Sequence, residues 1–228
     1  MNWITTFFSS SVGRKIIMAL TGLFLCVFLV IHMLGNMQLL NHDGGKAFNE
    51  YAELMGHNPL IQLISKVNFV LILFHIIDGL MLTMRNRAAR PSKYAVTPKS
   101  STWASRNMAL MGIFILVFLV VHLKSFWFES KFGSLPTVSY EGHSYKDLYS
   151  ITVAAFADWW YVAIYVVGLA ALAFHLVHGF QSAFQTLGIN HSKYTPAIKI
   201  VGYAFALIIP LLFASQPIIL FLRHQGIF

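Results

Sequence analysis

Long apolar stretches without charged residues alternate with short polar segments along the whole chain. Five stretches reach the length of about 20 residues that an α-helix needs to cross a bilayer. They cover approximately residues 15–39, 59–84, 107–128, 158–187 and 196–222. Asn58 followed by Pro59 predicts the start of the second helix, and Pro210 and Pro217 predict kinks in the fifth. The pattern therefore predicts an all-α membrane protein with a single transmembrane domain over residues 1–228.

The composition supports this fold class. The chain has 228 residues, of which 57% are hydrophobic and only 11% are charged, whereas soluble domains have about 25% charged residues. The net charge of +8 is interpreted as a topology signal and not as a surface for nucleic acid. The single cysteine, Cys26, excludes an internal disulfide and a cysteine zinc site, and we expect it to be a packing residue.

The distribution of charge predicts the orientation. The loop between the second and third stretches has six basic residues and no acidic residue: Arg85, Arg87, Arg90, Lys93, Lys99 and Arg106. The loops at 41–66 and 124–158 contain acidic residues as well as basic ones. Positively charged loops stay in the cytoplasm. We therefore expect a cytoplasmic N-terminus, a first helix that is not a cleaved signal, and a C-terminus outside.

Histidines occur deep inside the first four stretches. A histidine in a bilayer core is costly and is by default a functional-site hypothesis. With a rise of about 1.5 Å per residue, His32 and His122 lie about 25 Å from the cytoplasmic edge and His75 about 15 Å from it. His175 lies about 26 Å from the outer edge, in the inner half. The depths predict an outer pair, His32 and His122, and an inner pair, His75 and His175.

Two such pairs suit two haems, because neutral imidazole binds iron and facing helices of a bundle commonly hold cofactors. Two strong axial ligands leave no open position on the iron, so such a haem transfers electrons. The alternatives are hydrogen-bonded packing residues or a proton relay in a haem-free transporter or proton-conducting protein. His178 follows His175 by one turn, and spacing alone allows either as the ligand. Asp78 follows His75 in the same way, and its role stays open.

Short motifs in a fixed order resemble a known family, the cytochrome b membrane anchor of succinate dehydrogenases and fumarate reductases. The resemblance is to the five-helix, di-haem type and covers about residues 9–222. Its marks are SSVGRKIIMALTG, HMLGN, AFNEYAELM, FHIIDGLMLTMRNRAARP, VVHL and FHLVHGFQSAFQTLGI. Another five-helix di-haem anchor, the gamma subunit of respiratory nitrate reductase, fits less well, because the fifth stretch contains no histidine.

The resemblance implies two haem b cofactors with one ligand from each of the first four helices. These are His32 and His122 for the outer haem, and His75 and His175 for the inner haem. The first histidine of FHLVHG is the ligand in the family, which favours His175 over His178.

The resemblance also implies partners. A flavoprotein subunit and an iron–sulfur subunit would dock on the cytoplasmic face of this chain, in a bacterial cell membrane. The chain would anchor them and transfer electrons between the iron–sulfur relay and a membrane quinone. In the five-helix, di-haem type this quinone is usually menaquinone. The complex would be part of a respiratory chain and the tricarboxylic acid cycle. It would be the quinone-reactive subunit of an enzyme, with no dicarboxylate chemistry of its own. A dimer of such heterotrimers stays open.

Two further roles follow from the resemblance. Relatives use an acidic residue beside the first outer loop for quinone chemistry, which implies Glu50 or Glu53, with Glu53 favoured by position; the alternative is a solvated loop acid. Arg85 ends the second stretch and is the best candidate to neutralise a propionate of the inner haem. Its alternative role is to set the topology.

Overall fold

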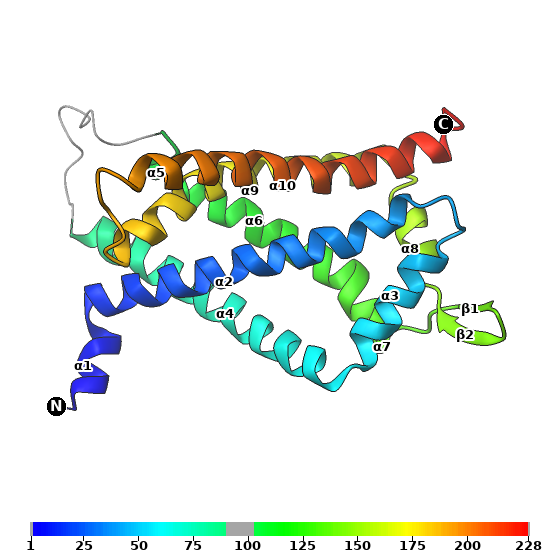
Figure 1. The fold of residues 1–228 in the computed structure, drawn as a ribbon, viewed down its shortest axis with the longest axis horizontal. Helices are drawn as coiled ribbons and strands as arrows, with labels where there is room; N and C mark the ends of the chain where they lie inside the picture. The colour runs from blue at the N-terminus through cyan, green and yellow to red at the C-terminus, as the bar shows by residue number, and fades with distance from the viewer. Residues whose placement is uncertain (1, 90–102, 228) are drawn as a thin grey trace.

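A computed structural model of the chain describes residues 2–89 and 103–227. Long helices run along one axis and form an elongated bundle, with shorter elements gathered at one end (Figure 1). The helices are α1 (Trp3–Ser9), α2 (Ser11–Met37), η1 (Gln38–Leu40), α3 (Lys46–His57), α4 (Pro59–Ala88), α5 (Trp103–Arg106), α6 (Met108–His122), η2 (Leu123–Phe128), α7 (Glu129–Phe132), α8 (Leu148–Ala155), α9 (Trp159–Thr186) and α10 (Thr195–His224). The strands are β1 (Thr137–Tyr140) and β2 (His143–Lys146).

Within the described residues, five helices are long and apolar enough to cross a membrane, which confirms the predicted multi-pass helical architecture. They span Ser11–Leu40, Pro59–Ala88, Met108–Phe132, Trp159–Thr186 and Thr195–His224. Most extend beyond the predicted boundaries, because polar residues at the ends continue the helices. Three basic residues of the orientation argument, Arg90, Lys93 and Lys99, lie outside the described residues.

Local sequence explains where the long helices begin. The side chain of Asn58 accepts hydrogen bonds from the backbone N–H groups of Leu60 and Ile61, at 3.0 and 3.2 Å, and Pro59 occupies the first turn. This confirms the predicted start of α4. Helix α10 is continuous and contains both Pro210 and Pro217, the positions at which the sequence predicts kinks.

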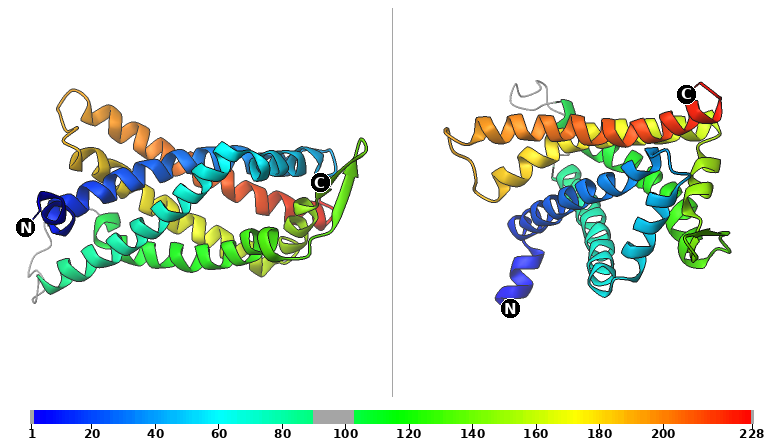
Figure 2. Two further views of the ribbon diagram at one scale, coloured as in Figure 1. Left: turned by 90° about the horizontal axis from the view of Figure 1, so that it is seen from below. Right: turned by 45° about the vertical axis from the view of Figure 1, so that its right-hand side comes forward.

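Four of the long helices form a closed ring. Helix α2 packs against α4, α4 against α6, α6 against α9, and α9 against α2. Helix α10 lies outside this ring and packs on α9 and α2, as the two further views also show (Figure 2). Large apolar side chains are exposed on all five long helices. Such a surface suits contact with lipid, where no hydrophobic force opposes apolar exposure.

Two buried apolar clusters stabilise the bundle. The larger lies where the start of α9 and the end of α10 meet η1 and the residues that connect α8 to α9. It consists of Leu39, Phe156, Tyr161, Val162, Tyr165 and Leu220. The smaller is formed by Cys26, Leu176 and Ala206. Cys26 is buried and unpaired, which confirms the predicted packing role.

The two ends of the bundle differ. One end, called the amino-terminal end, carries α1, the start of α2 and the end of α4. The other, called the cap, consists of α3, α7, the hairpin β1–β2 and α8 (Figure 1). The antiparallel hairpin turns through Glu141 and Gly142, whose φ angles are 52° and 84°. Two successive positive φ angles are typical of a type I′ turn.

The cap was only partly expected. A small surface structure was predicted within residues 130–150, and the hairpin lies there. Helix α3, however, occupies a segment that we had interpreted as a loop. Asp43 starts this helix, because its carboxylate accepts hydrogen bonds from the N–H groups of Gly45 and Ala47 at 3.0 and 2.9 Å.

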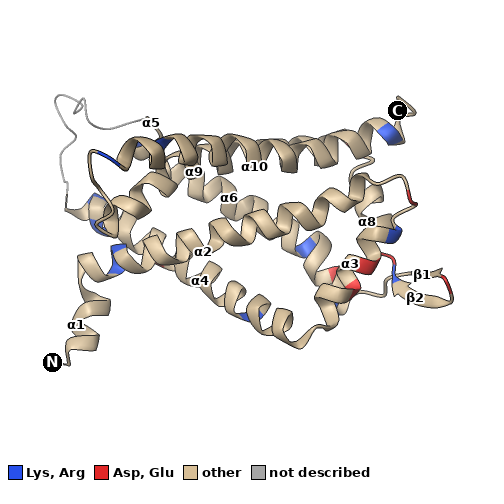
Figure 3. Cartoon of the chain, in the orientation of Figure 1, with Lys and Arg blue, Asp and Glu red and all other residues tan. Residues whose placement is uncertain are grey.

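Acidic residues gather at the cap, as Figure 3 shows. Seven of the eight acidic residues of the chain lie in the cap or in the residues that adjoin its elements; the exception is Asp78, on α4. The basic residues Arg14, Lys15, Arg85 and Arg87 lie at the amino-terminal end. The charge asymmetry seen in the sequence is therefore an asymmetry between the two ends of the bundle.

Candidate functional site

The four histidines predicted from depth lie in two facing pairs. The ring centres of His32 and His122 are 5.8 Å apart, with an angle of 86° between the ring planes. Those of His75 and His175 are 6.2 Å apart, with an angle of 67°. The structure thus brings together the residues that the sequence paired. We call them the outer pair and the inner pair.

Each pair connects helices that are not neighbours in the ring. The outer pair joins α2 to α6, and the inner pair joins α4 to α9, whereas the extensive contacts in the ring run α2–α4–α6–α9–α2. Each pair therefore spans one diagonal of the four-helix ring. Side chains that meet across a diagonal point into the centre of the bundle, where helical bundles hold their cofactors.

The spacing of the rings fits a shared metal ion. Two imidazoles on opposite sides of one ion, with metal–nitrogen bonds of about 2.0 Å, have ring centres about 6 Å apart. Among the described residues, no group of three or more His, Cys, Asp or Glu side chains could hold a metal ion. A haem needs only two protein ligands, because its porphyrin supplies four nitrogens. The donor set and its spacing therefore fit two bis-histidine haems.

The hydrogen bonds of His75 leave one of its ring nitrogens free. Its Nδ1 lies 3.1 Å from the hydroxyl oxygen of Thr21, on α2. That hydroxyl donates its own proton to the carbonyl of Ile17 at 2.8 Å, so its oxygen is free to accept from Nδ1–H. This arrangement leaves the lone pair on Nε2, and such a partner typically orients a ligating histidine.

His122 has a similar partner. Its Nδ1 lies 3.2 Å from the hydroxyl of Tyr165, on α9. His122 is also the last residue of α6 before the π-helical stretch η2. Such stretches change the direction of the side chains that follow and are frequent at functional sites. The apolar pattern of the sequence does not distinguish η2 from the α-helix that precedes it.

His175 differs from the other three ligand candidates. Its Nδ1 is buried and has no hydrogen-bond partner among the described residues. His178, one turn further along α9, is half-buried, and its ring makes no contact with that of His75 in the described part of the chain. The geometry therefore pairs His75 with His175. A buried ring nitrogen without a hydrogen-bond partner is uncommon and is a feature of functional sites.

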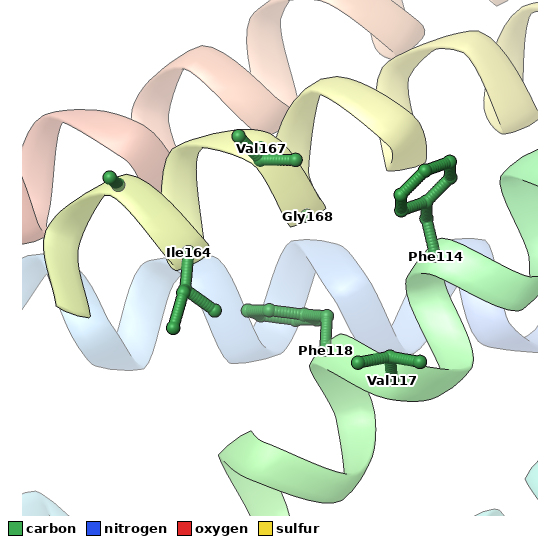
Figure 4. A pocket seen from close by; sticks show the side chains of 7 residues that line it. Phe114, Val117, Phe118, Ile164, Val167 and Gly168 are labelled. Atoms are coloured by element: carbon green, nitrogen blue, oxygen red, sulfur yellow. The ribbon is translucent and has the colours of Figure 1, made fainter. Parts of the chain in front are cut away.

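A narrow apolar groove lies beside the outer pair, between α6 and α9 (Figure 4). Its volume is about 270 Å³. Phe118 lines this groove and stacks on His122, with ring centres 5.7 Å apart. Gly168 on α9 faces Phe118, and a Cβ atom at this position would lie 2.6 Å from the Phe118 ring. The glycine therefore allows α9 to approach α6 at the level of His122.

An ion pair lies beside the inner pair. The guanidinium of Arg14 is 3.1 Å from the carboxylate of Asp78, which is buried one turn from His75. This places the intramembrane acid against a counter-charge, as the cost of burying a charge requires. Arg85, the predicted propionate partner, is exposed and donates to the carbonyl of Ser9 at 3.3 Å. The described residues show no contact between Arg85 and the inner pair.

The two predicted acids lie on α3, in the cap. Glu50 is 3.9 Å from Lys46, and Glu53 is 3.1 Å from Nδ1 of His57. Neither carboxylate contacts the outer pair within the described residues. However, Tyr51, between the two acids, packs closely on Gly35 of α2, one turn beyond His32.

Asn49 organises the cap and was not identified from the sequence. It is 1% exposed, and its side-chain amide nitrogen donates to Asp147 at 3.1 Å and to the Tyr140 hydroxyl at 3.2 Å. Its oxygen accepts from the backbone N–H of Tyr149 at 3.0 Å. Thr21, Tyr165 and Asn49 were missed because their importance depends on partners more than 40 residues away.

No family model, curated protein or solved structure matches this chain. A function for this chain is therefore inferred from the geometry of the described residues and from the sequence resemblance.

Proposed function

We propose that this chain is the di-haem cytochrome b subunit of a succinate:quinone oxidoreductase. The observation that supports this most is the pair of histidine contacts, each across one diagonal of the ring, at the spacing of two axial ligands. His32 and His122 would hold one haem b, and His75 and His175 the other. When bound, the haems supply one-electron transfer between the iron–sulfur subunit and a quinone.

The amino-terminal end would face the cytoplasm of a bacterial cell and receive the flavoprotein and iron–sulfur subunits. Its basic residues and the acidic cap support this orientation, since positive charge stays on the cytoplasmic side. On this side, Thr21 orients His75, and Arg14 compensates the charge of Asp78. Arg85 stays a candidate for a propionate at the same end.

The cap would serve the quinone, which we take to be menaquinone. Quinone reduction consumes protons, so the site needs groups that exchange protons with water. The side chains of Glu50 and Glu53 are 42% and 38% exposed, and therefore reach water. Tyr51, between the two acids in the sequence, packs on Gly35 one turn beyond His32, so α3 contacts α2 at the level of that turn. His57 lies beside Glu53 and adds a further polar group at this place.

The first test is a reduced-minus-oxidised spectrum of the purified chain, with a pyridine haemochrome count. We expect two b-type haems per chain. A colourless, well-folded chain from haem-replete cells would refute the proposal and favour a haem-free transporter or proton-conducting protein.

Single substitutions then assign the ligands. His122→Ala should remove one haem, and His75→Ala should remove the other, which differs in its spectrum. His178→Ala is the matched control for His175→Ala, since the two positions lie one turn apart on α9. Loss of a haem in His178→Ala with full content in His175→Ala would overturn the ligand assignment.

A further inference from the structure

Helix α10 contributes no histidine to the two pairs, yet it carries a buried polar side chain. Gln216 is 4% exposed, and its amide nitrogen has no hydrogen-bond partner among the described residues. The other buried residues of this helix are apolar or small: Gly202, Ala206, Ile209, Pro210, Pro217 and Leu220. A buried donor without an acceptor is unfavourable, most of all away from water, so a partner is expected.

The neighbours of Gln216 place it beside the outer pair. Phe213, three residues earlier on the same face of α10, has its ring centre 5.6 Å from that of His32. Leu220, four residues later on that face, packs in the cluster that contains Tyr165. The hydroxyl of Tyr165 in turn contacts His122. Gln216 is thus bracketed by residues that lead to both histidines of the outer pair.

The packing of α10 gives the direction of this face. Helix α10 covers the line along which α2 and α9 meet, and these two helices are neighbours in the ring (Figure 2). A residue buried on α10 at this level therefore faces α2 and α9, the helices that carry His32 and Tyr165.

We propose that the side-chain amide of Gln216 donates a hydrogen bond to an oxygen atom of a group bound beside the outer pair. This inference rests on the proposed function and adds a fifth helix to the outer site. Two groups present such an oxygen, the carboxylate of a haem and the carbonyl of a quinone. Both accept one hydrogen bond from a primary amide in the same way.

The first experiment does not depend on activity. The full-length chain, prepared without haem, is compared with Gln216→Leu in thermal unfolding, before and after addition of iron protoporphyrin IX. Leucine has a similar size and needs no acceptor, so the haem-free variant should unfold at the same temperature as the wild type or higher. If the acceptor is the haem carboxylate, the haem-induced rise in unfolding temperature should be smaller, and the dissociation constant of the outer haem should rise about tenfold.

A second arm identifies a quinone acceptor. If the carbonyl of a quinone is the partner, Gln216→Leu should bind haem as the wild type does, and KM for a menaquinol analogue should rise about three- to tenfold. Gln216→Asn keeps the amide, so it should retain part of the wild-type haem affinity in the first arm, or of the wild-type KM in the second.

Gln181→Leu is the matched control. The amide nitrogen of Gln181 also lacks a hydrogen-bond partner among the described residues, but Gln181 lies near the C-terminal end of α9, away from the outer pair. It should leave the outer haem and KM unchanged. Unchanged haem affinity and unchanged KM in Gln216→Leu would overturn the inference while leaving the proposed function intact. Failure of the wild-type chain to bind haem would instead refute the proposed function.

Discussion

Replacing Asn49 by alanine should open the cap without disturbing the helical ring. This side chain is almost completely buried and joins α3 to β1 and α8 through Tyr140, Asp147 and Tyr149. All three partners lie about 90–100 residues further along the chain. No hydrogen bond within α3 can replace them.

The magnitude follows from the nature of each bond. A neutral hydrogen bond contributes about 1 kcal/mol, and a bond to the carboxylate of Asp147 contributes about 2 kcal/mol. The alanine also leaves the buried N–H of Tyr149 without its acceptor, which adds about 1 kcal/mol or more. The free energy of opening the cap should therefore fall by about 3–5 kcal/mol.

Hydrogen exchange of the chain in nanodiscs measures this directly. Amide protons of α3 and α8 should exchange at least 100-fold faster in Asn49→Ala, while those of α9 keep the wild-type rate. Glu50→Gln is the control, because this neighbouring side chain is partly exposed and should leave exchange in the cap unchanged. Equal exchange rates in Asn49→Ala and the wild type would refute the argument that these buried bonds stabilise the cap.

Three further outcomes are expected. Glu53→Gln should slow menaquinol turnover about 10²-fold with both haems retained, and wild-type turnover would remove Glu53 from the site. Burial raises the pKa of Asp147, but hydrogen bonds from Ser150 and Asn49 lower it by a larger amount, so this pKa lies below its ordinary value. The resulting stability is present at neutral pH and is lost as the pH falls below about 4. Pepsin cleavage of the cap should then increase in the wild type. The same dependence of cleavage on pH in Asp147→Asn would contradict this. Gly35→Ala should lower the free energy of unfolding in nanodiscs by about 1–3 kcal/mol, because the new methyl group displaces Tyr51. If adding Tyr51→Ala does not remove this loss of stability, the contact is not its cause.

The five membrane helices could be predicted because long apolar stretches have few alternatives in a bilayer. The depth of each histidine also follows from the constant rise of a helix, so the proximity of His32 to His122 could be anticipated. Ligation of a haem by these histidines stays a prediction.

The cap could be predicted only in outline, for a different reason. Its elements are short, and α3 has a polar composition that resembles a loop. Asn49 and Asp147 come together only in the folded chain. The diagonal arrangement was equally hidden, because a single sequence does not show which helices of a bundle are neighbours. Gln216 could have been noticed as the polar residue within an apolar stretch, but its missing partner is visible only in the structure.

The ion pair between Arg14 and Asp78 has a consequence for biogenesis. An unpaired aspartate within a membrane helix costs up to about 3 kcal/mol during insertion, and α4 carries Asp78 in its second half. Arg14 lies at the start of α2, which is synthesised first and is therefore already in the membrane when α4 arrives. We expect α2 to act as a template that lowers the barrier to insertion of α4. The two helices would then enter the bilayer as a hairpin, and His75 would already be in place when α9 delivers His175.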